Sequence, residues 1–539
     1  KNLFFLILIL FSINTIGQNW YDNSSSKKGN IRGFIYDKKN GEPIMFCNVI
    51  LKAKNDVMKG DQITVTGATT DINGMYNISK VQAGDYTLLV EYLGYDAKKI
   101  NISLKSGQIL NQNIELQEAS IKLNEIKISA EREEMKTEVK AAVIKISKKD
   151  LEMVPTIGGE PDLAQYMQII PGVVFTGDQG GQLYIRGGSP IQNKVLLDGM
   201  IIYSPFHSIG LFSVFDTDII RNTDVYTGGF NAEYGGRISS IMDIKTIDGN
   251  KKNLGGKLSA NTFGAKLFIE GPLSNSGNSS FLFSGKTSYL DKSSDLFYKY
   301  PILYFDKKGL PYSFTDLYAK LSSKGKNGSK ISVFGFNFQD NVNYENISEL
   351  QWDSKGVGSE FILIPSGSPV LIEGNFAWSA YDISLNEESS PLRKSGIQGF
   401  NMGFDFTYFQ PKSKIKYGFD IHGFSTEFLT YNSVNSKIEQ NENTSEFSAY
   451  INYQLTNTRL IIEPGFRLQK YTLGFSPEPR LGFKYIASDK MRIKMSSGLY
   501  SQNILSTTSD RDVVNLFTGI ISSPEEIPEQ EDGSPYKNK

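Results

Sequence analysis

The residue types that most often carry covalent chemistry are scarce in this chain. Its 539 residues include two histidines, His207 and His422, and one cysteine, Cys47. A hydrolase needs a nucleophile, a base and a group that orients the base, and no motif of the sequence supplies such a set. Cys47 stands in an apolar segment, residues 44–51, and is expected to be a small buried residue. The sequence therefore predicts a protein that is not an enzyme and uses no cofactor or metal.

Four charged residues stand inside motifs that are otherwise apolar or rich in glycine. They are Arg186, Asp198, Glu233 and Arg237. Charged side chains that become buried are expected to pair with opposite charges, so these four are candidates for structural ion pairs. Direct contact with a ligand is the alternative.

A loop with aromatic residues, proline and one of the two histidines follows an apolar strand at residues 203–207. Its candidate functional residues are Tyr203, Phe206 and His207. Functional residues often stand on loops that a rigid scaffold positions, which favours a ligand-contacting loop. A packed surface turn is the alternative for the same residues.

The elements that must position these side chains are short. Apolar strands are expected at 183–185, 194–197, 221–226 and 241–245, separated by glycine doublets that permit tight turns. Leu163, Tyr166, Met167 and Ile170 fall at helical spacing before Pro171 and Gly172, so a helix is expected to end there. The pattern indicates a small α/β unit.

Five motifs of this unit carry a family resemblance. The motifs are PGV at 171–173, IRG at 185–187, LLDG at 196–199, GGFNAEYGG at 228–236 and ISSIMDIKT at 238–246. Residues 137–249 resemble the plug domain of TonB-dependent outer-membrane receptors, because these five motifs occur in the order found in that domain. The resemblance implies that a β-barrel surrounds this domain. The four charged residues then become candidates for a latch between plug and barrel wall, and the loop at 203–207 for an outward ligand loop.

The segment before the plug has a different residue pattern. Between residues 31 and 116, about seven short strands alternate with turns such as Asn40-Gly41 and Asn73-Gly74, which predicts a β-sandwich. Residues 29–117 resemble the carboxypeptidase regulatory-like domain that often precedes such plugs. A zinc peptidase site is excluded there because neither histidine falls in this segment.

The linker at 118–136 contains LNEIKISAERE. This segment resembles the box that the periplasmic TonB-type energy-transducing protein recognises. Its candidate partner-binding residues are Glu125, Ile126, Lys127, Ile128, Ser129 and Ala130. An exposed alternating strand can add to a sheet edge of a partner through main-chain hydrogen bonds. An ordinary linker, or a first plug strand, is the alternative.

The first 18 residues combine a lysine, an apolar run at 3–13 and small or polar residues, which is typical of a secretory signal peptide. A short N-terminal anchor helix is the alternative. The protein is thus expected to leave the cytoplasm. With the resemblance, this implies the outer membrane, with the N-terminal domain in the periplasm.

After residue 249 the chain shows segments of about ten residues with alternating polarity, as transmembrane β-strands do. In residues 414–422 Tyr417 and Phe419 are expected to face lipid and Gly418 the lumen, so that arginine would be tolerated at Gly418. About eleven strands are expected at 250–539, whereas plugged transporter barrels have on the order of 22. The chain is therefore expected to hold a partial antiparallel barrel and to be incomplete.

Overall, the sequence predicts a mainly β protein: a β-sandwich, a small α/β plug and a partial transmembrane barrel. The formal charge, 57 − 58 = −1, has no basic block, so nucleic acid is not an expected partner. The implied function is TonB-coupled import of a bulky nutrient ligand of the siderophore, cobalamin or glycan class. The implied partners are the TonB-type protein, outer-membrane lipid and that small or oligomeric ligand, and a surface lipoprotein is a further candidate. A barrel-anchored adhesion or signalling receptor is the alternative function.

Overall fold

The structure is a computed structural model of the whole chain. It describes residues 28–53, 64–119, 142–156, 160–176, 182–208, 210, 212–291, 311–344, 347–388, 390–410, 412–432, 434–457, 459–472, 474–488, 491–507 and 517–522. The predicted signal peptide at 1–18 and the box-like segment at 125–130 lie outside these ranges.

The first domain is a sandwich of two sheets. One sheet has β1 (Gly29–Asp37) at its centre, paired with β4 (Met75–Val81), β7 (Ile109–Asn111) and β8 (Ile114–Leu116). The other has the order β3 (Thr64–Thr69), β2 (Asn48–Ala53), β5 (Gly84–Glu91), β6 (Lys98–Leu104). Alternate residues such as Ile31, Val49 and Leu88 fill the space between them, and Cys47 is buried there. The predicted sandwich is confirmed, with eight strands in its described part.

The plug contains one five-stranded sheet. Its order is β13 (Met200–Ile202), β12 (Asn193–Leu197), β15 (Ser240–Thr246), β14 (Ile220–Tyr226), β9 (Val143–Ser147). A hairpin of β10 (Val173–Thr176) and β11 (Gln182–Ile185), a short 3-10 helix η4 (Pro190–Gln192) and the helices α3 (Lys148–Leu151) and α4 (Leu163–Met167) complete the described plug. Asp162 caps α4 by accepting a hydrogen bond from the Ala164 amide. The predicted strands are all present, whereas the helix ends before Ile170.

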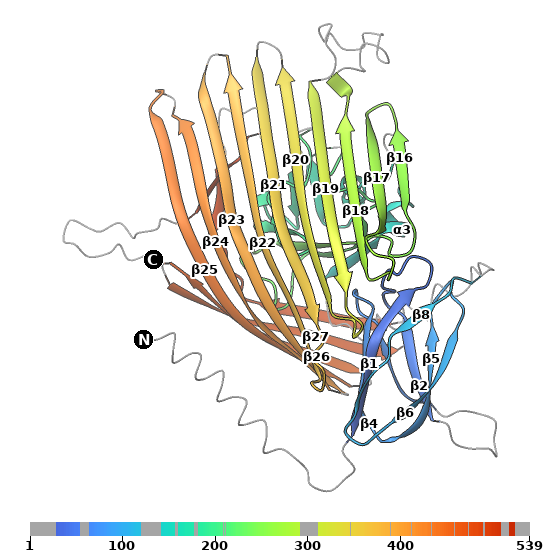
Figure 1. Cartoon of the computed structure of the whole chain (residues 1–539). Helices are drawn as coiled ribbons and strands as arrows, with labels where there is room; N and C mark the ends of the chain where they lie inside the picture. Colours follow the sequence, from blue (N-terminus) through green and yellow to red (C-terminus); the bar gives the residue numbers. More distant parts are fainter. Residues whose placement is uncertain are drawn as a thin grey trace.

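Thirteen antiparallel strands, in chain order, form a curved wall with the plug on its concave side (Figure 1). They are β16 (Gly255–Ala260), β17 (Gly264–Pro272), β18 (Ser279–Ser288), β19 (Tyr312–Lys324), β20 (Lys330–Tyr344), β21 (Ser348–Leu363), β22 (Val370–Glu387), β23 (Ser390–Phe409), β24 (Ser413–Tyr431), β25 (Lys437–Thr456), β26 (Leu460–Tyr471), β27 (Gly474–Ser488) and β28 (Met491–Gly498). The expected number of about eleven was too low.

The two faces of the wall differ as the alternation predicts. In β24, Tyr417 is 40% exposed on the convex face, and the next residue, Gly418, is buried on the concave face. The expectation that arginine fits at Gly418 was wrong. A Cβ atom there would lie 2.4 Å from the Phe404 carbonyl oxygen and 2.6 Å from Asp405 Oδ1, because neighbouring strands fill this space.

The first domain contacts one end of the wall, at the turns 325–329 and 364–369 (Figure 1). Phe34 and Met75 pack against Ile362 and Leu371 of the wall. Arg32, which is 1% exposed, donates from Nη1 to the Ser368 carbonyl (2.5 Å) and from Nη2 to the Pro365 carbonyl (2.7 Å). After β28 the chain forms a hairpin of β29 (Ile504–Thr507) and β30 (Gly519–Ser522). The hydroxyl of Ser522 hydrogen-bonds to that of Thr426 on the concave face of the wall.

Candidate functional site: the interface between plug and wall

Asp198 connects the plug to the wall through a buried ion pair. Asp198 directly follows β12 and has a φ of 50°. Its carboxylate lies beside Thr246, the last residue of β15. Thr246 donates to it from its amide (2.9 Å) and its hydroxyl (2.6 Å). From β19 of the wall, Tyr318 Oη (2.9 Å) and Lys320 Nζ (3.1 Å) donate to the same carboxylate. Lys320 also reaches Glu360 at 3.0 Å, so two wall strands share this contact.

A second cluster joins all three domains. Asp248, at the end of the plug, accepts from Arg221 Nη2 (2.9 Å), Lys251 Nζ (3.0 Å) and Lys330 Nζ of the wall (3.0 Å). Arg221 also pairs with Glu42 of the first domain at 2.9 Å. Burial alone would raise the pKa of Asp248, but the surrounding cations outweigh burial and hold that pKa well below its usual range. The cluster is therefore charged at neutral pH and ties first domain, plug and wall together.

Glu233 makes a third contact. It forms an ion pair with Lys416 of β24, which lies 3.5 Å from Asp405 of β23 as well. Beside it, Arg467 of β26 pairs with Asp420 at 2.9 Å. Gly235 is needed there because a Cβ atom at this position would lie 2.2 Å from Arg467 Nε. The glycine doublet thus lets the wall arginine approach the plug backbone.

The other two proposed latch residues behave differently. Arg186 is exposed, with a φ of 48°, so the burial that would require a charged partner does not apply to it. Arg237 is 7% exposed and donates from Nη1 to the Gly236 carbonyl at 2.8 Å. Among the described residues, no carboxylate lies within 4.0 Å of its guanidinium. Asp198 and Glu233 therefore form ion pairs with the wall, whereas Arg186 and Arg237 form none within the part of the chain that the structure describes.

The loop at 203–207 packs against the wall. His207 is fully buried, with Nε2 2.9 Å from Asp316 Oδ2 and Nδ1 3.0 Å from Asp340 Oδ2. Its ring stacks on Phe314 with ring centroids 4.0 Å apart. Phe206 is 3% exposed. Phe206 and His207 are thus both buried against the wall in this structure.

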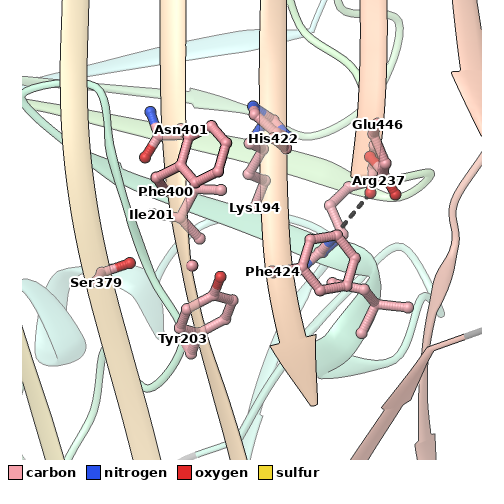
Figure 2. Close-up of a pocket in the computed structure, with 13 residues that line it drawn as sticks. Lys194, Ile201, Tyr203, Arg237, Ser379, Phe400, Asn401, His422, Phe424 and Glu446 are labelled. Carbon is pink, nitrogen blue, oxygen red and sulfur yellow. Dashed lines mark hydrogen bonds between the residues drawn. The ribbon is translucent and has the colours of Figure 1, made fainter. Parts of the chain in front are cut away.

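Tyr203 borders a small pocket between the plug and wall strands β22 to β25. Figure 2 shows Lys194 and Arg237 entering it from the plug and His422 and Glu446 from the wall. Glu446 accepts a hydrogen bond from Gln469 Nε2 at 3.0 Å. The volume of the pocket, about 20 Å³, suits one small guest.

A larger chamber of about 600 Å³ lies between the concave face of the wall, the plug and the first domain. Its lining mixes carboxylates, amides and lysines, including Asp243, Asn375, Lys414 and Asp420. The plug and the wall thus share both this polar chamber and a hydrophobic core, to which Leu197 and Phe215 of the plug and Phe334 and Phe338 of the wall belong. Among the described residues, no group of three or more His, Cys, Asp or Glu side chains is arranged to hold a metal ion.

The wall residues of these contacts were not identified from the sequence. They are Asp316, Lys320, Asp340, Glu360 and Lys416. Such residues could be predicted from charged residues that recur at the inward-facing positions of strands with alternating polarity. Lys416 occupies such a position in the predicted segment 414–422. Within the described residues, no helix has the length and apolarity to cross a membrane.

Comparison with known families assigns the first two domains. Residues 31–128 match the model of the CarboxypepD_reg-like domain, and residues 135–240 match that of the TonB-dependent receptor plug domain. A search of curated proteins found no match.

Comparison with solved structures finds receptors and a transporter of similar fold. A mutant of the ferric enterobactin receptor PfeA from Pseudomonas aeruginosa aligns over 73% of this chain and 68% of its own, at 14% identity and a TM-score of 0.52. The siderophore receptor PirA from Pseudomonas aeruginosa aligns over 72% and 69%, at 14% and 0.51. The FrpB iron transporter from Neisseria meningitidis aligns over 69% and 65%, at 15% and 0.51. These similarities establish the fold, and the chain spans 61–69% of the length of the receptors it matches.

Proposed function

Since the chain carries the plug domain of TonB-dependent receptors behind a CarboxypepD_reg-like domain, we propose that it is an outer-membrane receptor that imports a nutrient ligand by energy-coupled displacement of the plug. One observation carries this proposal: the plug lies on the concave face of the wall and is held there by ion pairs such as Asp198–Lys320. A domain that only anchors a protein in the membrane needs no such plug.

The convex face of the wall supports placement in a lipid bilayer. It exposes large apolar side chains on successive strands: Leu317, Leu321, Ile331, Val333, Val357, Phe376, Phe400, Tyr417, Ile451 and Phe466. A transmembrane barrel has such an apolar outer band and a polar interior. We place the first domain, and the end of the wall that it contacts, on the periplasmic side of this bilayer.

The plug sheet suggests where movement begins. Strand β9 is the first described strand after the linker that carries the box-like segment, and in the described structure it pairs only with β14, over five residues. A periplasmic TonB-type partner that binds residues 125–130 by strand addition would pull on this edge strand first. Peeling an edge strand breaks one ladder rather than two, so β9 is the part of the sheet that yields most easily.

The proposed ligand is a bulky nutrient, with the siderophore class first because the similar structures are those of a ferric enterobactin receptor, a siderophore receptor and an iron transporter. Cobalamin and glycans remain alternatives within import. A barrel-anchored adhesion or signalling receptor without transport is the alternative function.

The substitution Ile128→Pro tests import. Proline removes one main-chain N–H and fixes φ, which an added strand does not tolerate. Ile128→Val is the matched control, because it keeps both the N–H and the β-branched shape. In the source cells, the proline variant should reach the outer membrane and bind labelled ferric siderophores like the wild type but fail to accumulate iron, whereas the valine variant should accumulate it. A deletion strain that takes up every candidate nutrient normally but loses surface attachment would instead establish the alternative.

A further inference from the structure

Two buried cations of the plug lack the carboxylate partners that their neighbours have. Lys194 of β12 is 8% exposed, and its Nζ donates to the Gly235 carbonyl at 3.2 Å. Arg237 is 7% exposed, and its Nε has no hydrogen-bond partner. Among the described residues, neither side chain has a carboxylate oxygen within 4.0 Å.

Other buried cations at the same interface are paired. Lys320 lies 3.1 Å from Asp198 and Lys266 lies 3.0 Å from Asp216. A buried charge without a partner costs several kcal/mol, so buried charges are normally paired. The lack of a carboxylate partner therefore distinguishes Lys194 and Arg237 from Lys320 and Lys266.

Both side chains border the same pocket of about 20 Å³ (Figure 2). Its one carboxylate, Glu446, is already engaged by Gln469. Two cations and one carboxylate leave a net charge of +1. The volume is enough for one water-sized sphere and too small for a polyatomic anion with its own hydration.

We propose that this pocket binds one small monovalent anion, chloride under physiological conditions, between Arg237 and Lys194. The anion neutralises the excess charge and accepts the hydrogen bond of Arg237 Nε. Since the wall buries both plug cations in this position, neutralising them with the bound anion stabilises the seated position of the plug.

The electrostatics of the plug agree with this assignment. Burial lowers the pKa of Lys194 to about 8 and also lowers the pKa of Arg237, which means that the site disfavours its own positive charges. An anion at hydrogen-bond distance has the opposite effect. Chloride should therefore raise the pKa of Lys194, and its affinity should fall as that lysine loses its proton.

Bromide identifies the site directly because it replaces chloride and scatters anomalously. Crystals of the full chain soaked in sodium bromide should show an anomalous peak within hydrogen-bond distance of Arg237 Nε and Lys194 Nζ. Bromide at surface positions only, a water in the pocket, or the Glu446 carboxylate turned onto Arg237 would each overturn the proposal.

A solution measurement with variants gives an independent test. Thermal unfolding of the detergent-solubilised chain is followed as sodium gluconate is replaced by sodium chloride at constant ionic strength. The wild-type Tm should rise with chloride and saturate, whereas Arg237→Gln and Lys194→Gln should lose this dependence. Lys416→Gln removes a buried cation that already has a partner, so it should lower Tm and keep the chloride dependence. A chloride response that persists in both pocket variants would locate the effect elsewhere and contradict the proposal.

Discussion

The Nε2 atom of His207 lies 2.9 Å from Oδ2 of Asp316, and this contact joins a plug loop to strand β19 of the wall. The other ring nitrogen faces Asp340 of β20 at 3.0 Å. One imidazole thus bridges two neighbouring wall strands while it is fully buried. A neutral ring cannot satisfy two carboxylates as well as an imidazolium, which donates from both nitrogens.

This bridge should depend on pH. Burial lowers the pKa of His207, but the carboxylates of Asp316 and Asp340 outweigh burial and raise the pKa above 6.5. Lys286, 3.3 Å from Asp316, is the other charged group nearby. Because the folded pKa exceeds the unfolded value, the stabilisation is complete below about pH 6.5 and is lost as pH rises through the folded pKa.

Hydrogen exchange of peptides covering 203–208 measures this effect once the rates are corrected for intrinsic pH dependence. Protection should fall with rising pH in the wild type. The variant His207→Gln should show lower protection and no such fall, while peptides from β14 serve as an internal reference. A pH profile that is the same in both proteins would exclude His207 as its source.

Replacing Asp198 by Asn should destabilise the seated plug. The change keeps the shape but removes the charge that Lys320 faces, and removal of one partner from a buried pair typically costs about 3–5 kcal/mol. Asp85→Asn, at an exposed position of the first domain, should change stability by less than about 0.5 kcal/mol. Denaturant titration with protease cleavage of the plug as the readout gives both values. Equal midpoints for the two variants would contradict a structural role of the pair.

The sequence predicts local elements of the plug better than their partners. Glycine doublets and short apolar runs mark β12, β14 and β15, since turn geometry and burial act on neighbouring residues. Asp198 was likewise identified by its position inside an apolar motif. Its partner Lys320 is 122 residues away, and only the register of the wall brings the two together. Local pattern does not encode that register.

The same limit explains the loop at 203–207. Aromatic residues, proline and histidine predict an ordered turn, but the same composition serves a ligand loop and a packed turn. Asp316 and Asp340, which hold His207, lie on strands whose inward faces become known only once the wall is assembled. Sequence alone therefore left both alternatives open.

Arg32→Met should release the first domain from the wall without unfolding it. The substitution leaves the Pro365 and Ser368 carbonyls without their donor, a loss of about 1–3 kcal/mol, whereas within the sandwich it removes one bond to Asn111. Small-angle scattering in detergent should show a larger radius of gyration, and exchange should increase at the turn 364–369. Lys39→Met removes an exposed pair with Glu118 and should change neither quantity. Loss of sandwich structure in the Arg32 variant would show that its main role is within the domain.

Phe419→Arg tests the assignment of the convex face to lipid. Phe419 stacks on Phe404 of β23, with ring centroids 5.2 Å apart, and its neighbour Tyr417 is exposed on the same face. An arginine near the midplane of the bilayer costs about 2–4 kcal/mol in a transmembrane barrel. Phe419→Leu is the matched control, because it removes the ring stacking but keeps an apolar surface. Folding into lipid vesicles, followed by heat-modifiable migration in gels, should decrease for the arginine variant and stay near wild type for the leucine variant. If both variants fold equally well into lipid, then Phe419 does not face the hydrocarbon core.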